Sequence, residues 1–211
     1  MSQVKIQSAL ISVFYKDNLA PIIELLKANG VTIYSTGGTQ KFIEEQGAEV
    51  VPVEDLTSYP SIFGGRVKTL HPKIHAGILN KRDSKLHSKD LKNNKFENID
   101  LVIVNFYPFE NTLKKTTDHR KIIENIDVGG PTMVRSAAKN YKDVTVITSS
   151  EQYKELIDEL DKYKGSTSLN FREKLSRIAF TETAYYDSVI SSYFNKVTNT
   201  NFPKKKCYMV T

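Results

Sequence analysis

The sequence contains very little cysteine and no long apolar run. Its 211 residues include one cysteine, Cys207, so neither a disulfide framework nor a cysteine-based zinc site can form within one chain. That scarcity is typical of a reducing compartment, and we predict a cytoplasmic location. No apolar stretch approaches the roughly 20 residues that cross a membrane. Strand-like sequence follows Met1 without the leader of a secreted protein, so we predict no membrane partner.

Positive charge is in modest excess but is not concentrated. The net charge is +6, yet most lysines stand among acidic residues. The one run of three lysines without acidic neighbours is Lys204–Lys206. Nucleic-acid-binding surfaces gather their lysines and arginines on one face, so we predict no nucleic-acid partner. The excess is compatible with a small anionic ligand.

Composition and length predict one domain. The chain is 39% hydrophobic and 26% charged, as globular proteins are. It is long enough to bury a core without disulfides or metals. We place the domain at 1–196 and interpret 197–211 as a polar tail or the start of a linker.

Apolar runs alternate with helical stripes along most of the chain. Strands are predicted over 4–13, 31–34, 48–53, 99–105 and 143–148. Helices are predicted from Asp17 as N-cap to Asn29-Gly30, from after Thr39 to Gly47, and over 119–125, 131–140, 150–163 and 170–195. Buried strands that alternate with helices form parallel sheets. The sequence therefore predicts an α/β fold with a doubly wound, mainly parallel five-stranded sheet and helices on both faces.

The alternation stops between residues 54 and 98, which are rich in glycine, proline, histidine, lysine and asparagine. A long stretch without periodicity inside a domain is usually functional or disordered. We interpret its second half, 81–98, as a solvated excursion.

The first half of this stretch holds the densest group of functional residue types, over Gly64–Leu79. Arg66 and Lys68 stand at alternate positions and point the same way in an extended segment, and Thr69 adds a hydroxyl. These groups suit a phosphate or a carboxylate. A solvated basic loop would have the same composition, so that alternative stays open.

A second motif, Ser35–Thr39, lies between a predicted strand and a predicted helix. The backbone N–H groups of such a turn form an anion site together with the helix N-terminus. Thr36 and Thr39 could add hydroxyl donors. The alternative is an ordinary turn with Thr39 as N-cap. The motif matches neither a P-loop nor a dinucleotide fingerprint.

Further candidates follow the fourth predicted strand. Asn105 and Tyr107 come at its carboxyl end, where parallel sheets bind ligands; alternatively they are a turn asparagine and a packing aromatic. Asp127 precedes a Gly-Gly-Pro helix start, and Lys139 falls near the end of that helix. Twelve residues span about 18 Å of helix, so Asp127 and Lys139 can meet only if the loop folds back or a second copy supplies one of them. Otherwise Lys139 complements the helix dipole.

The two histidines His71 and His75 are four residues apart and would share a face if helical. Pro72 argues against a helix, and no third ligand lies nearby, so we predict no metal. We also find no nucleophile elbow and no setting for a catalytic thiol at Cys207. No cofactor is predicted.

Taken together, these motifs resemble those of the IMP cyclohydrolase domain at the N-terminus of the bifunctional purine biosynthesis protein. The resemblance covers residues 4 to about 195. It rests on the stretches Ala9–Val13, Ser35–Thr39, Gly64–Pro72, His75–Leu79, Asn105–Phe109 and Asp127–Pro131, which occur in the family's order.

The resemblance implies a methylglyoxal-synthase-like fold, a homodimer and the last step of purine synthesis. That step closes 5-formamidoimidazole-4-carboxamide ribotide to inosine monophosphate with loss of water. The resemblance implies catalytic roles for Lys139 as proton-transfer lysine and for Asp127, Lys68 and Tyr107. It implies substrate contacts at Ser12, Lys16, Thr36, Gly37, Gly38, Thr39, Arg66, Val67, Lys68, Thr69, Asn105, Asp127, Val128, Gly129 and Gly130. We expect the amides of Gly129 and Gly130 to stabilise the reacting oxygen.

Two departures from the family pattern stand out. A Ser-Asp-Lys triplet often follows the first strand, whereas this chain has Phe14-Tyr15-Lys16, so binding at positions 14 and 15 would have to use backbone. The family usually continues into a formyltransferase domain, and a full-length protein would also carry that activity. This chain reads as a fragment or as a stand-alone enzyme.

Two other functions are alternatives to ring closure. A non-catalytic regulatory module of the same fold would bind a purine nucleotide without turnover. Methylglyoxal synthase should carry its own aspartate and histidine pattern, which this sequence lacks.

Overall fold

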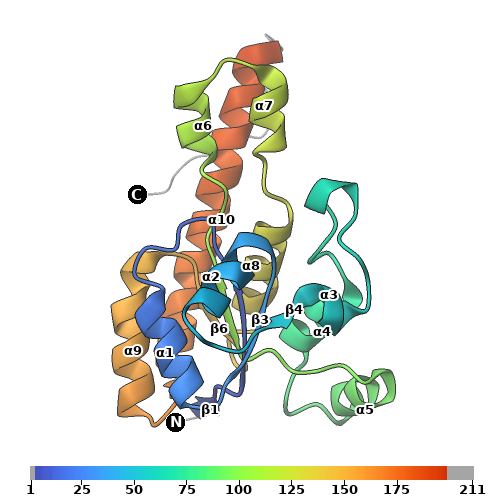
Figure 1. Cartoon of the computed structure of the whole chain (residues 1–211), viewed down its shortest axis with the longest axis vertical. Coiled ribbons are helices and arrows are strands. Elements are labelled where there is room, and N and C mark those ends of the chain that lie inside the picture. Colours follow the sequence, from blue (N-terminus) through green and yellow to red (C-terminus); the bar gives the residue numbers. More distant parts are fainter. Residues whose placement is uncertain (1–2, 199–211) are drawn as a thin grey trace.

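The computed structural model describes residues 3–198, and a five-stranded sheet forms their centre (Figure 1). The strands lie in the order β4-β3-β2-β5-β6, and every neighbouring pair is parallel. Their bounds are Ser8–Ser12 (β2), Thr32–Ser35 (β3), Val51–Pro52 (β4), Leu101–Val104 (β5) and Thr145–Ile147 (β6). The predicted fold class is therefore confirmed.

The strand order creates a switch point in the middle of the sheet. The chain first adds β3 and β4 on one side of β2, and then returns to place β5 and β6 on the other side. The loops that leave the carboxyl ends of β2 and β5 consequently diverge, and sheets of this kind bind ligands in the crevice between such loops.

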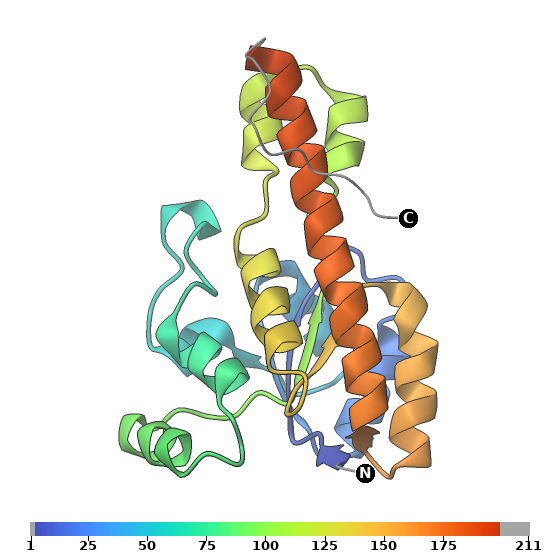
Figure 2. The ribbon, with the colours of Figure 1, turned by 180° about the vertical axis from the view of Figure 1, so that it is seen from behind.

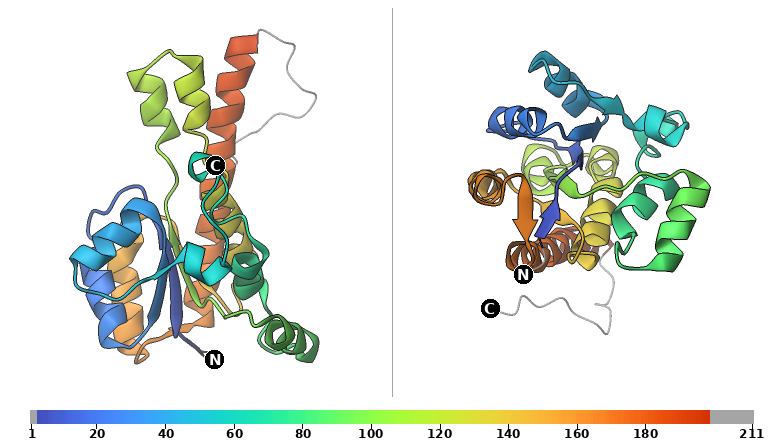
Figure 3. Two further views of the ribbon diagram at one scale, coloured as in Figure 1. Left: turned by 45° about the vertical axis from the view of Figure 1, so that its right-hand side comes forward. Right: turned by 90° about the horizontal axis from the view of Figure 1, so that it is seen from below.

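Helices cover both faces of the sheet, as the view from below shows (Figure 3, right). Helices α1 and α2 contact β3 on one face, where α9 packs against α1, while α8 and α10 contact β6 on the other face, where α4 packs against α8. Their bounds are Ala20–Ala28 (α1), Gly37–Glu45 (α2), Pro72–Leu79 (α4), Gly129–Lys139 (α8), Tyr153–Lys162 (α9) and Leu169–Thr198 (α10). The apolar stripes of these helices fill one continuous core with the buried strands.

The long helix α10 extends well beyond the sheet, and two short helices pack against its far end (Figure 2). These are α6 (Phe109–Lys115), which was not predicted, and α7 (His119–Glu124), which was. A second small core forms there around Phe109, Ile122 and Tyr186. None of the helices among residues 3–198 is both long enough and apolar enough to cross a membrane.

The start of the chain differs from the prediction. The single strand predicted over 4–13 is two strands, because β1 (Gln3–Lys5) leaves the sheet and pairs antiparallel with β7 (Ser166–Ser168). The N-cap of α1 is Leu19 rather than Asp17, with proline in the first turn. The strand predicted over 48–53 shrinks to the two residues of β4.

The stretch 54–98 is more regular than predicted. It contains α3 (Val53–Thr57), the 3₁₀ helix η1 (Phe63–Gly65), α4 and α5 (Lys85–Asn94). Pro72 opens α4 instead of preventing it, because a proline at the first helical position has no N–H to leave unpaired. The solvated excursion is the helix α5, which buries no residue and so has no apolar stripe to reveal it.

Other helix boundaries shift by small amounts. The helix predicted over 150–163 begins with the 3₁₀ helix η2 (Ser150–Gln152), and α10 runs to Thr198. The remainder of the predicted tail, with Lys204–Lys206 and Cys207, lies outside the described residues.

Candidate functional site

A cavity of about 650 Å³ opens at the switch point, at the carboxyl ends of β2 and β5. Its walls come from the loops after these strands, the segment 64–70, the end of α7 and the N-termini of α2 and α8. Most of the predicted site residues line it: Ser12, Lys16, Thr36, Gly37, Gly38, Thr39, Arg66, Lys68, Thr69, Asn105, Tyr107, Asp127, Val128, Gly129 and Gly130. The fold thus brings together residues that are more than 100 positions apart.

The N-terminus of α2 forms a positively charged corner of this cavity. A Cβ atom on Gly37 would lie 3.4 Å from Nζ of Lys68, and one on Gly38 would lie 3.8 Å from Nζ of Lys16. Gly37 also has a φ of +56°, which favours glycine. Two ammonium groups therefore flank free helix N–H groups, an arrangement that suits a phosphate.

The threonines of this corner have different roles. Thr39 is buried inside α2, and its hydroxyl both accepts a hydrogen bond from the N–H of Val13 (3.0 Å) and donates one to the Val13 carbonyl (2.9 Å). In the free chain that hydroxyl holds the β2 loop on α2, and its use as a ligand donor stays a prediction. Thr36, not Thr39, is the N-cap, and its hydroxyl lies 3.4 Å from Glu54.

Asn105 holds the loop that replaces the family's polar triplet. Its Oδ1 accepts a hydrogen bond from the N–H of Phe14 (2.5 Å), and its Nδ2 donates to the carbonyl of Tyr15 (3.3 Å). Nζ of Lys16 donates a hydrogen bond to the carbonyl of Phe14 (2.8 Å). The backbone polar groups of Phe14 are consequently occupied as well, and the residue presents a half-exposed ring that packs edge-on at 5.8 Å from Tyr107.

The carboxylate of Asp127 lies in another wall of the cavity, at the start of α8. Its Oδ1 accepts the N–H of Gly130 at 2.9 Å. Burial raises the pKa of Asp127, and the backbone N–H groups of Gly130 and Tyr107 oppose that rise. In the free chain Asp127 occupies the Gly130 amide, and the expected use of that amide to stabilise a reacting oxygen stays a prediction.

Both glycines at this helix start are sterically required. A Cβ atom on Gly130 would collide with the Asp127 carboxylate, and one on Gly129 would lie 2.6 Å from Oγ1 of Thr69. Thr69 is buried at this contact. The segment 64–70 and the N-terminus of α8 therefore fit together only because no side chain separates them.

The segment 64–70 is itself a tight loop. Val67 does not line the cavity; it pairs with Ile62 in an isolated antiparallel bridge that closes the loop. Gly65 has a φ of +92°, and a Cβ atom there would lie 2.8 Å from the Lys68 side chain. Arg66 forms an ion pair with Glu124 at the end of α7.

Lys139 is the one predicted catalytic residue that the fold keeps away from the cavity. It is exposed at the C-terminus of α8, whereas the N-terminus of that helix lines the cavity, about 15 Å away. The loop before α8 does not fold back toward it. Lys139 could reach such a cavity only in another copy of the chain.

Two residues of the site were missed at the level of sequence. Tyr186 on α10 accepts the N–H of Asp127 on its hydroxyl at 2.8 Å, and Glu124 lines the cavity beside Arg66. Tyr186 is 59 positions from its partner and lies on an ordinary apolar stripe. No local pattern could have identified it.

The histidines have structural contacts. His71 is the N-cap of α4 and accepts the N–H of Lys73 (3.2 Å) on Nδ1, and Nδ1 of His75 lies 3.1 Å from the Ser136 hydroxyl on α8. Burial lowers the pKa of His75. Among residues 3–198, no three histidine, cysteine, aspartate or glutamate side chains gather as a metal site requires.

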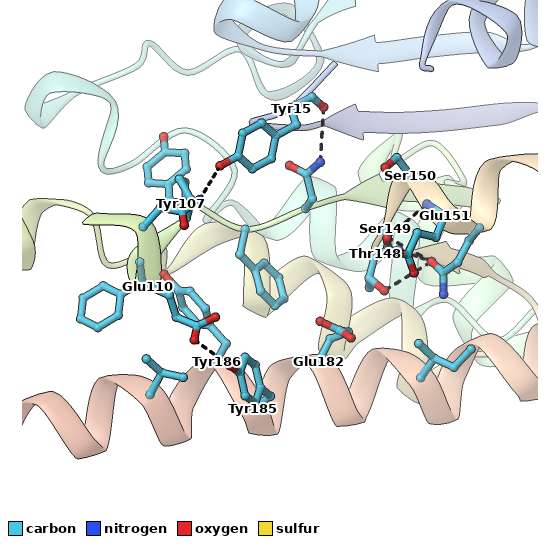
Figure 4. A pocket seen from close by; sticks show the side chains of 18 of the residues that line it. Tyr15, Tyr107, Glu110, Thr148, Ser149, Ser150, Glu151, Glu182, Tyr185 and Tyr186 are labelled. Atoms are coloured by element: carbon cyan, nitrogen blue, oxygen red, sulfur yellow. Dashed lines mark hydrogen bonds between the residues drawn. The ribbon is translucent and has the colours of Figure 1, made fainter. Parts of the chain in front are cut away.

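A second cavity, also of about 650 Å³, lies between α10 and the loops that follow β5 and β6 (Figure 4). Its charged lining residues are all acidic: Asp17, Glu110, Glu151 and Glu182. The Tyr185 hydroxyl donates to Glu110 at 2.7 Å. An anion would be repelled here, so the cavity at the switch point is the candidate site for a phosphorylated ligand.

Comparison with known proteins gives matches along almost the whole chain. Residues 18–132 match the family described as "MGS-like domain", and residues 137–210 match the family described as "AICARFT/IMPCHase bienzyme". The chain is 50% identical over 190 residues to the bifunctional purine biosynthesis protein PurH of Persephonella marina, and 47% identical over 196 residues to that of Bacteroides thetaiotaomicron. These alignments cover 90% and 92% of this chain but 37% and 39% of the relatives.

A solved structure also matches. The structure titled "Crystal structure of ForH" superimposes with a TM-score of 0.79 at 30% identity, over 90% of this chain and 99% of that one. The fold of this chain therefore also occurs in a second protein, whose chain matches along almost its whole length.

The partly buried carboxylate of Asp127 leads to a prediction about pH. The raised pKa means that the folded chain holds this proton at pH values where the unfolded chain, with an ordinary pKa of about 4, has lost it. The folded state therefore bears the cost of a buried charge once pH exceeds the raised pKa. Asp127→Asn removes that charge. We therefore expect the free energy of unfolding of the variant, minus that of the natural chain, to increase as pH rises from 4 to 7, as measured by urea titration. A difference that stays constant or shrinks would contradict this.

The hydrogen bond that the Tyr186 hydroxyl accepts from Asp127 leads to a second prediction. Tyr186→Phe leaves the N–H of Asp127 without its acceptor, which should lower the free energy of unfolding by about 1–3 kcal/mol. The neighbouring Tyr185→Phe is the matched control, because it removes a hydroxyl from an exposed contact and should cost less. Equal losses in the two variants, measured by urea denaturation, would show that the Tyr186 hydroxyl does not hold the Asp127 loop.

Proposed function

This chain belongs to the MGS-like domain family, and on that premise we propose that it is an IMP cyclohydrolase. The reaction closes 5-formamidoimidazole-4-carboxamide ribotide to inosine monophosphate with loss of water. The chain spans less than two fifths of the length of its PurH relatives, so we propose this one activity for the residues described.

One observation carries the proposal. A single cavity has two ammonium groups at the N-terminus of one helix and a partly buried carboxylate at the N-terminus of another. A ribotide has the matching polarity, with a phosphate at one end and a carboxamide on the ring at the other. Lys16, Lys68 and the α2 amides would hold the phosphate, and Asp127 would face the ring.

The chemistry needs orientation more than an external reagent. The carboxamide nitrogen attacks the formyl carbon of the same molecule and loses one proton. The formamido nitrogen loses the second proton as its bond to that carbon becomes double, and the formyl oxygen leaves with both protons as water. Holding the two groups at attack distance can supply several kcal/mol, with about 7–11 kcal/mol as the limit in ideal cases. A cavity that binds the ribotide both at its phosphate and at its ring provides that orientation.

We assign the proton steps to the ring end of the cavity. Asp127 accepts the carboxamide proton, and its raised pKa brings it closer to the pH at which a base works best. Tyr107, whose side chain is half exposed at the cavity wall, donates to the departing oxygen. Lys68 was expected to be catalytic, but its position beside Gly37 supports a phosphate contact instead. Lys139 would take part only from a second copy.

We also propose that the chain forms a homodimer and works in the cytoplasm, as the resemblance implies. Exposed apolar side chains on α10 support an association surface: Phe180, Tyr185, Phe194 and Val197. The same cavity would also serve a regulatory module that binds inosine monophosphate without turnover. An assay that follows product absorbance separates that alternative from an enzyme.

The role of Asp127 leads to a third prediction. Asp127→Asn should lower kcat for ring closure by about 100-fold or more, because general-base catalysis typically contributes that much. Its affinity for inosine monophosphate should change much less, since the phosphate corner is intact. Asp90→Asn on the exposed helix α5 removes the same charge outside the cavity and controls for net charge. Turnover of Asp127→Asn at the rate of Asp90→Asn would refute the assigned role.

A further inference from the structure

One cation of the cavity is already neutralised by the protein itself. Nη2 of Arg66 is hydrogen-bonded to Oε1 of Glu124, and both residues line the cavity. Arg66 follows η1, whereas Glu124 ends α7, so the pair joins two walls that are 58 positions apart. Lys16 and Lys68 make no such ion pair with a carboxylate among the described residues.

The Arg66–Glu124 pair can be broken at little cost. The two side chains are 64% and 60% exposed, and an exposed ion pair contributes only about 0.2–1 kcal/mol. A phosphate dianion carries more charge than a carboxylate and accepts the planar fork of an arginine equally well. A phosphorylated ligand in the cavity can therefore replace Glu124 as the partner of Arg66.

We propose that Glu124 is an internal competitor for Arg66, which lowers the affinity of the cavity for phosphorylated ligands. In the free chain Glu124 holds the arginine. When a ligand brings its phosphate into the cavity, Arg66 exchanges the carboxylate for the phosphate, and Glu124 turns to solvent. This inference deepens the proposed function and takes its ligand from it.

The consequence is a modest reduction in affinity for every ligand whose phosphate contacts Arg66. Glu124 weakens the binding of a ribotide and of inorganic phosphate by the same factor, and the ribotide keeps its additional contacts near Asp127. Because substrate and product carry the same phosphate, Glu124 weakens the binding of both.

The test is calorimetric titration of the chain with inosine monophosphate, inosine and inorganic phosphate. Glu124→Gln keeps the shape of the side chain and removes its charge. We expect it to tighten binding of inosine monophosphate and of phosphate by about 1.5- to 5-fold, the range that corresponds to 0.2–1 kcal/mol at 1.36 kcal/mol per decade. Binding of inosine, which lacks the phosphate, should not change. The gain should decrease as salt is raised.

Two further variants keep the test specific. Glu173→Gln breaks another exposed Glu–Arg pair, between Glu173 and Arg177 on α10, and should leave all three affinities unchanged. In an Arg66→Met background, Glu124→Gln should gain clearly less for inosine monophosphate, because the competitor then has no arginine to hold. A full gain in that background would show that Glu124 does not act through Arg66.

The outcomes separate this inference from the proposed function. Unchanged or weaker binding of inosine monophosphate by Glu124→Gln, or an equal gain for inosine, overturns the competitor role while the enzyme stands. Failure of the natural chain to bind inosine monophosphate overturns the proposed function. In that case, tighter binding of inorganic phosphate by Glu124→Gln would still support the competition for Arg66.

Discussion

The partial burial of one carboxylate, that of Asp127, is the constraint on which the site depends. A buried charge is tolerated only where hydrogen bonds compensate it, and here Gly130 supplies one from the start of α8. The backbone of Asp127 is in turn held by the Tyr186 hydroxyl on α10. The long helix therefore does more than cover the sheet: its extension beyond the sheet fixes the loop that places the carboxylate.

Charge is divided between the two cavities in a way that the net charge of +6 does not reveal. The cavity at the switch point is lined by three cationic side chains and a helix N-terminus against two carboxylates, those of Glu124 and Asp127, while the charged residues of the cavity beside α10 are all acidic. The two share Asn105 and Tyr107 as a dividing wall. An anionic ligand is thus directed to one side of that wall by electrostatics alone.

Much of this could be predicted from the sequence, and the failures have physical causes. The parallel sheet follows from buried apolar strands such as β5, and the cavity residues follow from motifs at strand ends. The helix α5 could not be predicted because it buries nothing. The engaged hydroxyl of Thr39 and the occupied amide of Gly130 depend on partners that only the fold brings close. Lys139 lies at the end of α8 that points away from the cavity, so its predicted catalytic role depends on a second copy of the chain, which the sequence left open.

The central claim is that one cavity holds the phosphate at α2 and the ring at Asp127. The most direct measurement is a crystal structure of the chain with bound inosine monophosphate. The account predicts that the phosphate contacts the amides of Gly37 and Gly38 between Lys16 and Lys68, that Arg66 has moved from Glu124 to the phosphate, and that the purine ring lies beside Asp127. A phosphate at the N-terminus of α8, or a nucleotide bound beside Tyr185 in the acidic cavity, would contradict it.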